Sequence, residues 1–190
     1  MPQEILIATH NLHKKEEIQQ ILGNGFIVKS LTDYGIHDEI VEDGNSFQEN
    51  AEIKAKFCFQ KTRIPSIGDD SGLVVLALDG RPGIHSARYA GDHDFPKNIA
   101  KVLEEMQYET NREAYFITVL CYFDENGAKF FEGKVFGNLL TENKGDQGFG
   151  YDPIFVPNNH EITFAEMLPE EKNKISHRKI AIDKLLEFLK

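Results

Sequence analysis

The sequence Ile67-Gly68-Asp69-Asp70-Ser71-Gly72 runs directly into the apolar residues 73–78, and this stretch decides the fold. The apolar run predicts a buried strand. Two carboxylates beside such a strand cost free energy unless they are paired or hold a metal. Successive side chains of a strand face opposite ways, so only one carboxylate is expected to reach a given cleft. We expect a functional site here, with the glycines letting the backbone bend; a polar turn between strands is the alternative.

Segments on both sides of this stretch alternate between strand and helix patterns. Strands are predicted at residues 4–8, 26–31, 114–123, 129–140 and 154–156, with Asn126-Gly127 as a hairpin signal. Helices are predicted from the N-cap Asn11 to residue 22, from the capping box at Ser46 to residue 61, at 95–106, and from Ser176 onward. The pattern predicts an α/β fold.

Composition and charge set broad limits on the function. The 190 residues are 41% apolar and 27% charged, which is ordinary for a single globular domain over residues 1–190. The net charge of -10 argues against a nucleic-acid polymer as partner, although a metal and a few cations can still bind one nucleotide. The chain has two cysteines, no cationic leader at Met1-Pro2-Gln3-Glu4, and no apolar run of the ~20 residues that a membrane helix needs. We therefore expect a cytoplasmic protein without membrane contact.

Two further polar motifs accompany the acid pair. Thr9-x-Asn11-x-x-Lys14 lies where a predicted strand meets a predicted helix, and the free backbone N–H groups of a helix start favour anions. His177 and Arg178 fall in the first turn of the last helix, where the dipole disfavours cations, so a ligand explains them better than helix stability. Each motif alone also fits solvated side chains; their co-occurrence indicates a site.

Other catalytic patterns fit this sequence poorly. Gly68-x-x-Ser71-Gly72 is not the nucleophile elbow of a serine hydrolase. His10-x-x-His13 could ligate zinc, but no third ligand has suitable spacing. Adjacent aspartates do not supply the separated carboxylates of a glycosidase, and the glycine-rich loops match neither a P-loop nor a Rossmann fingerprint. Carboxylates that can hold a metal, together with scattered cations, instead suit a phosphoanhydride substrate.

Taken together, these motifs resemble the inosine triphosphate pyrophosphatase family, whose members hydrolyse XTP, ITP and dITP to the monophosphate and pyrophosphate. The resemblance runs in order along nearly the whole chain. The matching segments are Thr9-His10-Asn11-Leu12-His13-Lys14, Val41-Glu42-Asp43-Gly44 with Ser46-Phe47, Glu49-Asn50-Ala51, Gly68-Asp69-Asp70-Ser71-Gly72-Leu73, Pro82-Gly83 with Ser86-Ala87-Arg88-Tyr89, Gly148-Phe149-Gly150-Tyr151-Asp152-Pro153, and Glu171-Lys172 with Ile175-Ser176-His177-Arg178. Departures from the family pattern are Lys144-Gly145-Asp146-Gln147, in place of a more glycine- and threonine-rich approach, and Val41, where bacterial relatives often carry a glutamate.

The resemblance implies a mixed α/β fold with a long, bent central mixed β-sheet, flanking helices, and two lobes with an intervening active-site cleft. It also implies a homodimer that depends on Mg2+ and acts on a small nucleotide. Asp70 is implied as the general base, and the implied metal ligands are Asp70, Glu42 and, as a further candidate, Asp69. The implied phosphate ligands are Thr9, Asn11, Lys14, Ser71 and Lys172. The implied contacts to the base and the rest of the substrate are His10, Leu12, His13, Phe149, Gly150, Tyr151, Asp152, His177 and Arg178, with Asn50, Lys54 and Arg88 as further candidates.

Two other functions remain open at this point. A Maf-type pyrophosphatase acting on pyrimidine or modified nucleotides would share the chemistry, although Ser176-His177-Arg178 with Phe149-Gly150-Tyr151-Asp152 favours purines. A non-catalytic nucleotide-binding regulator would not need the acids, so the presence of Glu42 with Asp69-Asp70 weighs against it.

Overall fold

A computed structural model describes residues 3–190, so the expectation for Met1 and Pro2 lies outside the described residues. Its strands are β1 (Gln3–Ile7), β2 (Phe26–Ser30), β3 (Ser66–Val75), β4 (Glu113–Asp124), β5 (Gly127–Leu139) and β6 (Phe155–Pro157). Its α-helices are α1 (Leu12–Leu22), α2 (Phe47–Thr62), α3 (Phe95–Glu105), α4 (Pro169–Ile175) and α5 (His177–Phe188). The predicted strands and helices are present with ends shifted by a few residues, whereas α4 was not predicted.

The six strands form one mixed sheet in the order β2-β1-β3-β4-β5-β6. β1 pairs in parallel with both β2 and β3, whereas β5 pairs with β6 in the antiparallel sense. With helices flanking these strands, the expected mixed α/β class is confirmed. The bend of the sheet and the cleft stay predictions.

The chain divides into two compact units. Unit 1 comprises Met1–Asp70, Thr118–Gly133 and Arg178–Lys190, and unit 2 comprises Ser71–Ile117 and Lys134–His177. Strands β3, β4 and β5 each contribute residues to both units. The single domain over residues 1–190 stays a prediction.

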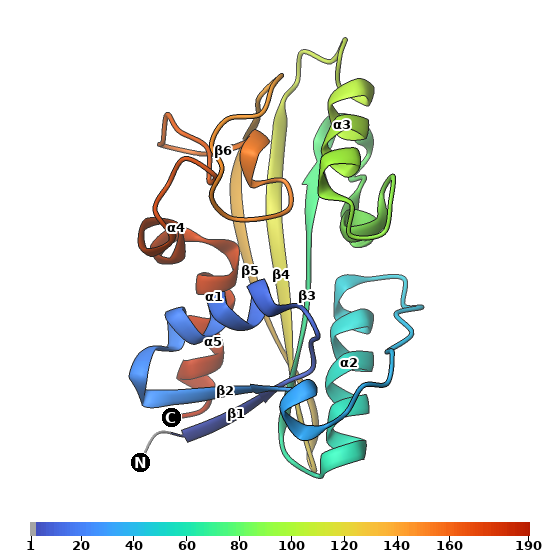
Figure 1. Cartoon of the computed structure of the whole chain (residues 1–190), viewed down its shortest axis with the longest axis vertical. Helices are drawn as coiled ribbons and strands as arrows, with labels where there is room; N and C mark the ends of the chain where they lie inside the picture. Colours follow the sequence, from blue (N-terminus) through green and yellow to red (C-terminus); the bar gives the residue numbers. More distant parts are fainter. Residues whose placement is uncertain (1–2) are drawn as a thin grey trace. The chain divides into compact units, whose positions relative to one another are not determined.

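In unit 1 the two faces of β1 contact different helices. Ile7 belongs to an apolar cluster with Ile18 of α1 and Ile182 of α5. Leu6 belongs to a second cluster with Cys58 of α2. Neighbouring side chains of a strand point to opposite faces. Accordingly, α2 lies on the other side of β1 from α1 and α5 (Figure 1).

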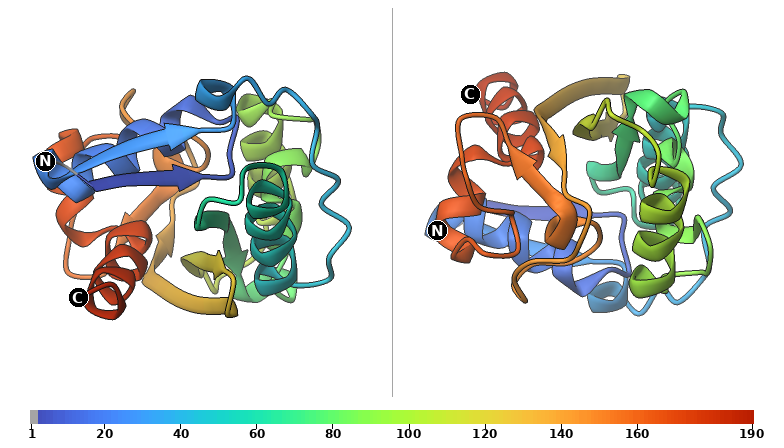
Figure 2. Two further views of the ribbon diagram at one scale, coloured as in Figure 1. Left: turned by 90° about the horizontal axis from the view of Figure 1, so that it is seen from below. Right: turned by 90° about the horizontal axis from the view of Figure 1, so that it is seen from above.

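The core of unit 2 joins α3 to the segment that contains β6. Val102 of α3 and Met106, which directly follows that helix, are fully buried in one cluster with Leu73 of β3 and the rings of Phe155 and Phe164. In Figure 1 and in the right-hand view of Figure 2, α3 lies on one side of the strands of this unit, and β6 with α4 lies on the other. Leu73, Val74 and Val75 of β3 are buried, as the apolar run predicted. The rest of that run corrects the prediction, because residues 76–78 form a 3-10 turn in which Leu76 is 45% exposed.

Helix ends and thiols match the sequence analysis. Asn11 Oδ1 accepts a hydrogen bond from the Lys14 backbone N–H, and Ser46 Oγ accepts one from the Glu49 N–H. Cys58 and Cys121 are buried free thiols, as their apolar neighbours predicted. Within residues 3–190, none of the helices combines the length and the apolar character needed to cross a membrane.

The acid-pair stretch lies within one continuous strand. Because β3 runs unbroken from Ser66 to Val75, the polar-turn alternative is excluded, whereas a bend at Gly68 or Gly72 stays a prediction. Gly68 is also needed for a packing reason. A Cβ atom at this position would lie 2.0 Å from the backbone oxygen of Ala51 and 2.8 Å from the backbone nitrogen of Ala55, so α2 crosses β3 in direct backbone contact.

We expect Gly68→Ala to destabilise the protein, because neither the strand nor the helix backbone can yield to the added methyl group. Overpacking of a core typically costs about 1–3 kcal/mol, and a contact with backbone belongs at the upper end of that range. Urea unfolding monitored by circular dichroism measures the change.

The matched control for this prediction is Gly25→Ala. An added Cβ at Gly25 meets nothing within 4 Å, and its φ does not lie in the left-handed region. The free energy of unfolding of the control is expected to exceed that of wild type by no more than about 1 kcal/mol. Equal unfolding midpoints for the two variants would contradict the close contact between α2 and β3.

Candidate functional site

Asp69 and Asp70 point to opposite sides of β3 and contact different cations. Lys14 Nζ lies 2.5 Å from Asp69 Oδ1, and Arg178 Nε donates to Asp69 Oδ2 at 3.0 Å. Asp70 Oδ1 instead accepts from Lys54 Nζ at 3.0 Å. The prediction that the two carboxylates face opposite ways on the strand is confirmed. All of these groups belong to unit 1.

The first predicted motif forms a compact turn at the start of α1. Thr9 Oγ1 accepts from the Asn11 N–H at 3.0 Å, and Asn11 Oδ1 accepts from the Lys14 N–H at 3.2 Å. Lys14 then extends its ammonium to Asp69, where it contacts both the side chain and the backbone oxygen. The structure therefore brings the Thr9–Lys14 motif and the acid pair together, as their co-occurrence predicted.

Arg178 forms its ion pairs with acids of unit 1. Its side chain is 1% exposed, and its guanidinium pairs with both Asp69 and Glu17 of α1. These buried acids explain a cation in the first turn of α5, where the helix dipole alone would disfavour it. Sequence analysis missed Glu17; the available signal was its position three residues after Lys14, which places both on one face of α1.

The ion network keeps Asp69 charged. Burial by itself would raise the pKa of the Asp69 carboxyl, but the neighbouring Lys14 and Arg178 cations outweigh burial and hold that pKa far below its usual range. Burial would likewise lower the pKa of Arg178, whereas Asp69 and Glu17 raise it above the ordinary value. Asp69 is therefore a permanent anion that holds Lys14 in place.

Asp70 belongs to a second group of contacts, built on α2. Lys54 Nζ lies 2.8 Å from Glu42 Oε2 as well as 3.0 Å from Asp70 Oδ1. Asn50, one helical turn before Lys54, donates from Nδ2 to Asp70 Oδ2 at 3.4 Å and accepts at Oδ1 from the Gly44 N–H at 2.9 Å. The loop that carries Glu42 is thus tied to the same helix face that contacts Asp70.

The surroundings of Asp70 favour its proton-bound form more than those of an ordinary aspartate. Burial raises the pKa of the Asp70 carboxyl, while the Lys54 and Lys14 cations oppose the change. Burial would lower the pKa of Lys54, but Asp70 and Glu42 reverse this effect and raise it. A carboxylate with a raised pKa in a cation-lined group has the character of a general base.

The donor set suits a hard divalent cation. Glu42 and Asp70 offer carboxylate oxygens around one point, and Mg2+ is commonly held by one or two carboxylates with water and substrate phosphates completing the shell. In the part of the chain that the structure describes, no three His, Cys, Asp or Glu side chains form a ready metal site. The residues therefore fit a metal that arrives with a phosphate ligand rather than one held in a protein cage.

A second cluster of predicted residues lies in unit 2. Lys172 Nζ lies 2.8 Å from Asp152 Oδ2, and the same oxygen accepts from the Phe149 N–H at 2.9 Å. The Lys172 ammonium also lies 5.0 Å from the centre of the Phe149 ring. Gly148 has φ +73°, and a Cβ there would lie 2.1 Å from Asp152 Oδ2. The loop at residues 148–152 therefore packs around a buried Lys172–Asp152 ion pair. Lys172, which was predicted to bind phosphate, thus lies beside residues that were predicted to contact the base.

Two other residues predicted to contact the base are packed into the core of unit 2. The Tyr151 hydroxyl donates to the Ser86 backbone oxygen at 2.9 Å, and the Tyr151 side chain is buried. The His177 ring stacks on Phe116 with ring centres 4.9 Å apart. His177 and Arg178 are consecutive, yet their side chains join different units. Any role of Tyr151 or His177 in base contact stays a prediction.

The remaining candidates lie nearer the surface. His10 Nε2 lies 3.1 Å from the Asp38 backbone oxygen, and Leu12, His13 and Arg88 have exposed side chains. Ser71 follows Asp70 on β3 and is half-buried, and Gly150 is half-buried in the loop before Tyr151. Their contacts with substrate stay predictions.

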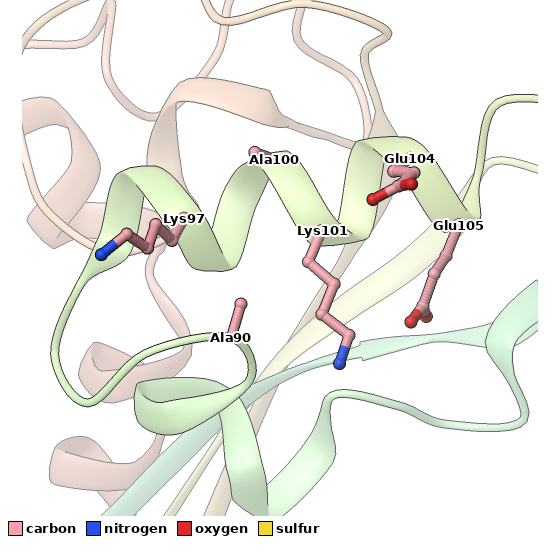
Figure 3. Close-up of a pocket in the computed structure, with 6 residues that line it drawn as sticks. All are labelled: Ala90, Lys97, Ala100, Lys101, Glu104 and Glu105. Carbon is pink, nitrogen blue, oxygen red and sulfur yellow. The ribbon is translucent and has the colours of Figure 1, made fainter.

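A shallow pocket on the outer side of α3 contains none of the predicted residues (Figure 3). Its lining residues are Ala90, Lys97, Ala100, Lys101, Glu104 and Glu105. Lys97 is paired with Asp94, and Lys101 donates to the Tyr89 backbone oxygen. Because both ammonium groups already contact other parts of the protein, they do not form a binding site for an anion in this pocket.

Comparison with known proteins identifies the family. The Ham1 family model matches residues 5–188. This chain belongs to the Ham1 family. A dITP/XTP pyrophosphatase of Porphyromonas gingivalis is 42% identical to it over 189 residues, covering 98% of this chain and 97% of the relative. A dITP/XTP pyrophosphatase of Halalkalibacterium halodurans is 46% identical over 191 residues and covers 98% of both chains.

Solved structures of the Ham1 family agree with this fold. A HAM1 protein from Coxiella burnetii matches with a TM-score of 0.89 and 38% identity, over 98% of each chain. The family expected from the motifs is therefore confirmed, and so is its mixed α/β fold.

We expect Asp69→Asn to destabilise this Ham1 protein at pH 7, because it leaves Lys14 and Arg178 with one buried anion fewer. Breaking a buried ion pair costs about 3–5 kcal/mol. The pKa of folded Asp69 lies below the value of about 3.9 in an unfolded chain, so the wild type loses this contribution as the pH falls below about 4. Asparagine does not titrate, and the gap between the two proteins should narrow there. Urea unfolding in EDTA at pH 7, 4 and 3 measures it.

Asp183→Asn is the control for this experiment. It removes the exposed Lys179–Asp183 pair of α5, an i, i+4 contact expected to contribute about 0.5 kcal/mol or less. A gap between wild type and Asp69→Asn that stayed constant or widened below pH 4 would show that Asp69 is not the permanent anion described above.

Proposed function

We propose that this Ham1 protein is a nucleoside-triphosphate diphosphatase that hydrolyses XTP, ITP and dITP to the nucleoside monophosphate and pyrophosphate. One observation carries the proposal: neighbouring acids on β3 gather the Thr9–Lys14 motif on one side and the Glu42–Lys54 contact on the other. The names of the relatives, dITP/XTP pyrophosphatases at 42% and 46% identity over nearly the whole chain, support the same activity.

The unit 1 residues act on the triphosphate. The backbone N–H groups at the start of α1, with Thr9 and Asn11, bind phosphate oxygens, as helix N-termini commonly do. Lys14 stabilises the negative charge that grows on the leaving pyrophosphate. Arg178 and Asp69 position Lys14; their buried contacts support this role better than a direct contact of Arg178 with the base.

Glu42 and Asp70 are the proposed ligands of Mg2+. When bound, this ion would polarise the phosphates and make the attacking water more acidic. Asp70 accepts the proton from that water as it attacks the α-phosphorus. General-base help of this kind is typically worth about 10²–10⁴-fold.

The unit 2 residues recognise the base. Phe149 offers a ring face for stacking, and Lys172 with Asp152 fixes the loop that carries it. Hypoxanthine and xanthine present a 6-oxo acceptor beside an N1–H donor, whereas adenine presents the reverse pattern. A buried site that matches the first pattern leaves its polar groups unpaired with adenine, at about 1–3 kcal/mol per group.

The proposal includes a cytoplasmic location and a homodimer. Two buried free thiols suit a reducing compartment. The homodimer is what the family resemblance implies.

The test is pyrophosphate release from a panel of XTP, ITP, dITP, GTP, ATP and dUTP, with and without Mg2+. We expect release from the first three only, and only with Mg2+. Preference for dUTP would indicate a Maf-type enzyme, and binding without release from any substrate would indicate a regulator.

We expect Asp70→Asn to leave nucleotide binding largely intact while lowering kcat for ITP at least a hundredfold, on the general-base estimate above. Asp79→Asn, in an exposed turn where asparagine tolerates the left-handed backbone, is the control and should keep wild-type turnover. Near-normal turnover of Asp70→Asn would remove Asp70 from the mechanism.

We expect Phe149→Ala to raise KM for every purine substrate by a similar factor, because stacking does not depend on the base edge. Loss of about 1–3 kcal/mol of stacking corresponds to roughly five- to 150-fold in KM. Phe130→Ala, an exposed ring on β5, serves as the control. Loss of the preference for ITP over GTP alone would contradict a stacking role.

A further inference from the structure

The Lys54 ammonium lies between the two carboxylates proposed to hold the metal. Lys54 Nζ is 2.8 Å from Glu42 Oε2 and 3.0 Å from Asp70 Oδ1. The side chains of Lys54 and Asp70 are 7% and 9% exposed, so little water separates these charges. A metal that bridged Glu42 and Asp70 would bind the same carboxylate oxygens that the ammonium now contacts.

The two acids are held in place by contacts that do not involve the ammonium. Asn50 binds Asp70 Oδ2 through Nδ2 and the Gly44 N–H through Oδ1, which ties the Glu42 loop to α2. The α2 backbone in turn lies directly against Gly68 of β3. Removal of the ammonium would therefore leave Glu42 and Asp70 near one another.

The charges of this group explain why a cation is needed there. The Glu42 and Asp70 carboxylates share one ammonium; they repel each other, and that ammonium compensates for part of the repulsion. A divalent ion compensates better, but it would then lie beside the Lys54 cation, and like charges in contact are unfavourable. The flexible stem of a lysine allows its ammonium to move away.

We infer that Lys54 is an internal counter-ion that stands in for the metal: it offsets the repulsion between Glu42 and Asp70 in the metal-free protein and competes with Mg2+ for them. The inference rests on the proposed assignment of Glu42 and Asp70 as metal ligands. It makes Lys54 a positioning residue that stabilises the metal-free site and weakens Mg2+ binding.

The test compares Lys54→Met with wild type in the absence of nucleotide. Thermal unfolding in EDTA and in rising Mg2+, with calorimetric titration of Mg2+, supplies the readouts. We expect the EDTA midpoint of Lys54→Met to fall, Mg2+ to restore it by a larger shift than in wild type, and Mg2+ to bind at least about tenfold more tightly. Lys54→Arg, which keeps the charge, should bind Mg2+ like wild type.

Lys61→Met is the matched control. Lys61 is also on α2 and also ties the same loop, through a 3.2 Å contact with Asp38, but both side chains are about half exposed and neither proposed ligand is involved. Its removal should leave Mg2+ affinity unchanged. If Lys54→Met does not fold in EDTA, Lys54→Gln carries the same measurements.

A spectroscopic measurement tests the wild-type protein directly. With 15N-labelled lysine, the Lys54 ammonium resonance should be protected from exchange in EDTA and lose that protection as Mg2+ saturates, whereas the Lys61 resonance should not change. Mg2+ that binds Lys54→Met no more tightly than wild type, or does not bind it at all, overturns the inference, as does an unchanged Lys54 resonance. Failure of the proposed function would appear separately, in the pyrophosphate-release panel.

Discussion

Unit 1 depends on the compensation of two adjacent buried carboxylates. Asp69 and Asp70 are consecutive on a buried strand, and the strand pleat sends them to opposite faces. Each face then needs its own cation: Lys14 and Arg178 on one side, Lys54 on the other. These cations come from three helices far apart in the sequence, so the charge requirement of a two-residue motif fixes where α1, α2 and α5 meet β3.

The same principle operates differently in unit 2. There the buried pair of Lys172 and Asp152 holds a loop rather than a helix, and the loop presents the Phe149 ring beside the ammonium. Unit 1 thus gathers carboxylates and cations from three helices around one strand, whereas unit 2 has an aromatic ring beside a buried ion pair.

The sequence predicted those features that local chemistry determines. The caps at Asn11 and Ser46, the buried strand after Asp70, and the opposite directions of the two acids follow from spacing alone. Which acid each buried cation pairs with could not be predicted in the same way. Lys172 and Arg178 are close in the sequence and equally cationic, and only tertiary packing decides that one meets Asp152 and the other Asp69 and Glu17. Gly68 illustrates the same limit, because its missing side chain accommodates a helix whose approach the local sequence does not reveal.

The contact of α2 with Gly68 constrains how the protein can change over evolutionary time. A side chain at Gly68 would meet the α2 backbone at Ala51 and Ala55, whose own side chains are fully buried. The spacing between α2 and β3 therefore depends on the missing side chain at Gly68. Descendants of this sequence can exchange the polar side chains that α2 and β3 carry more freely than they can change the spacing of these two elements.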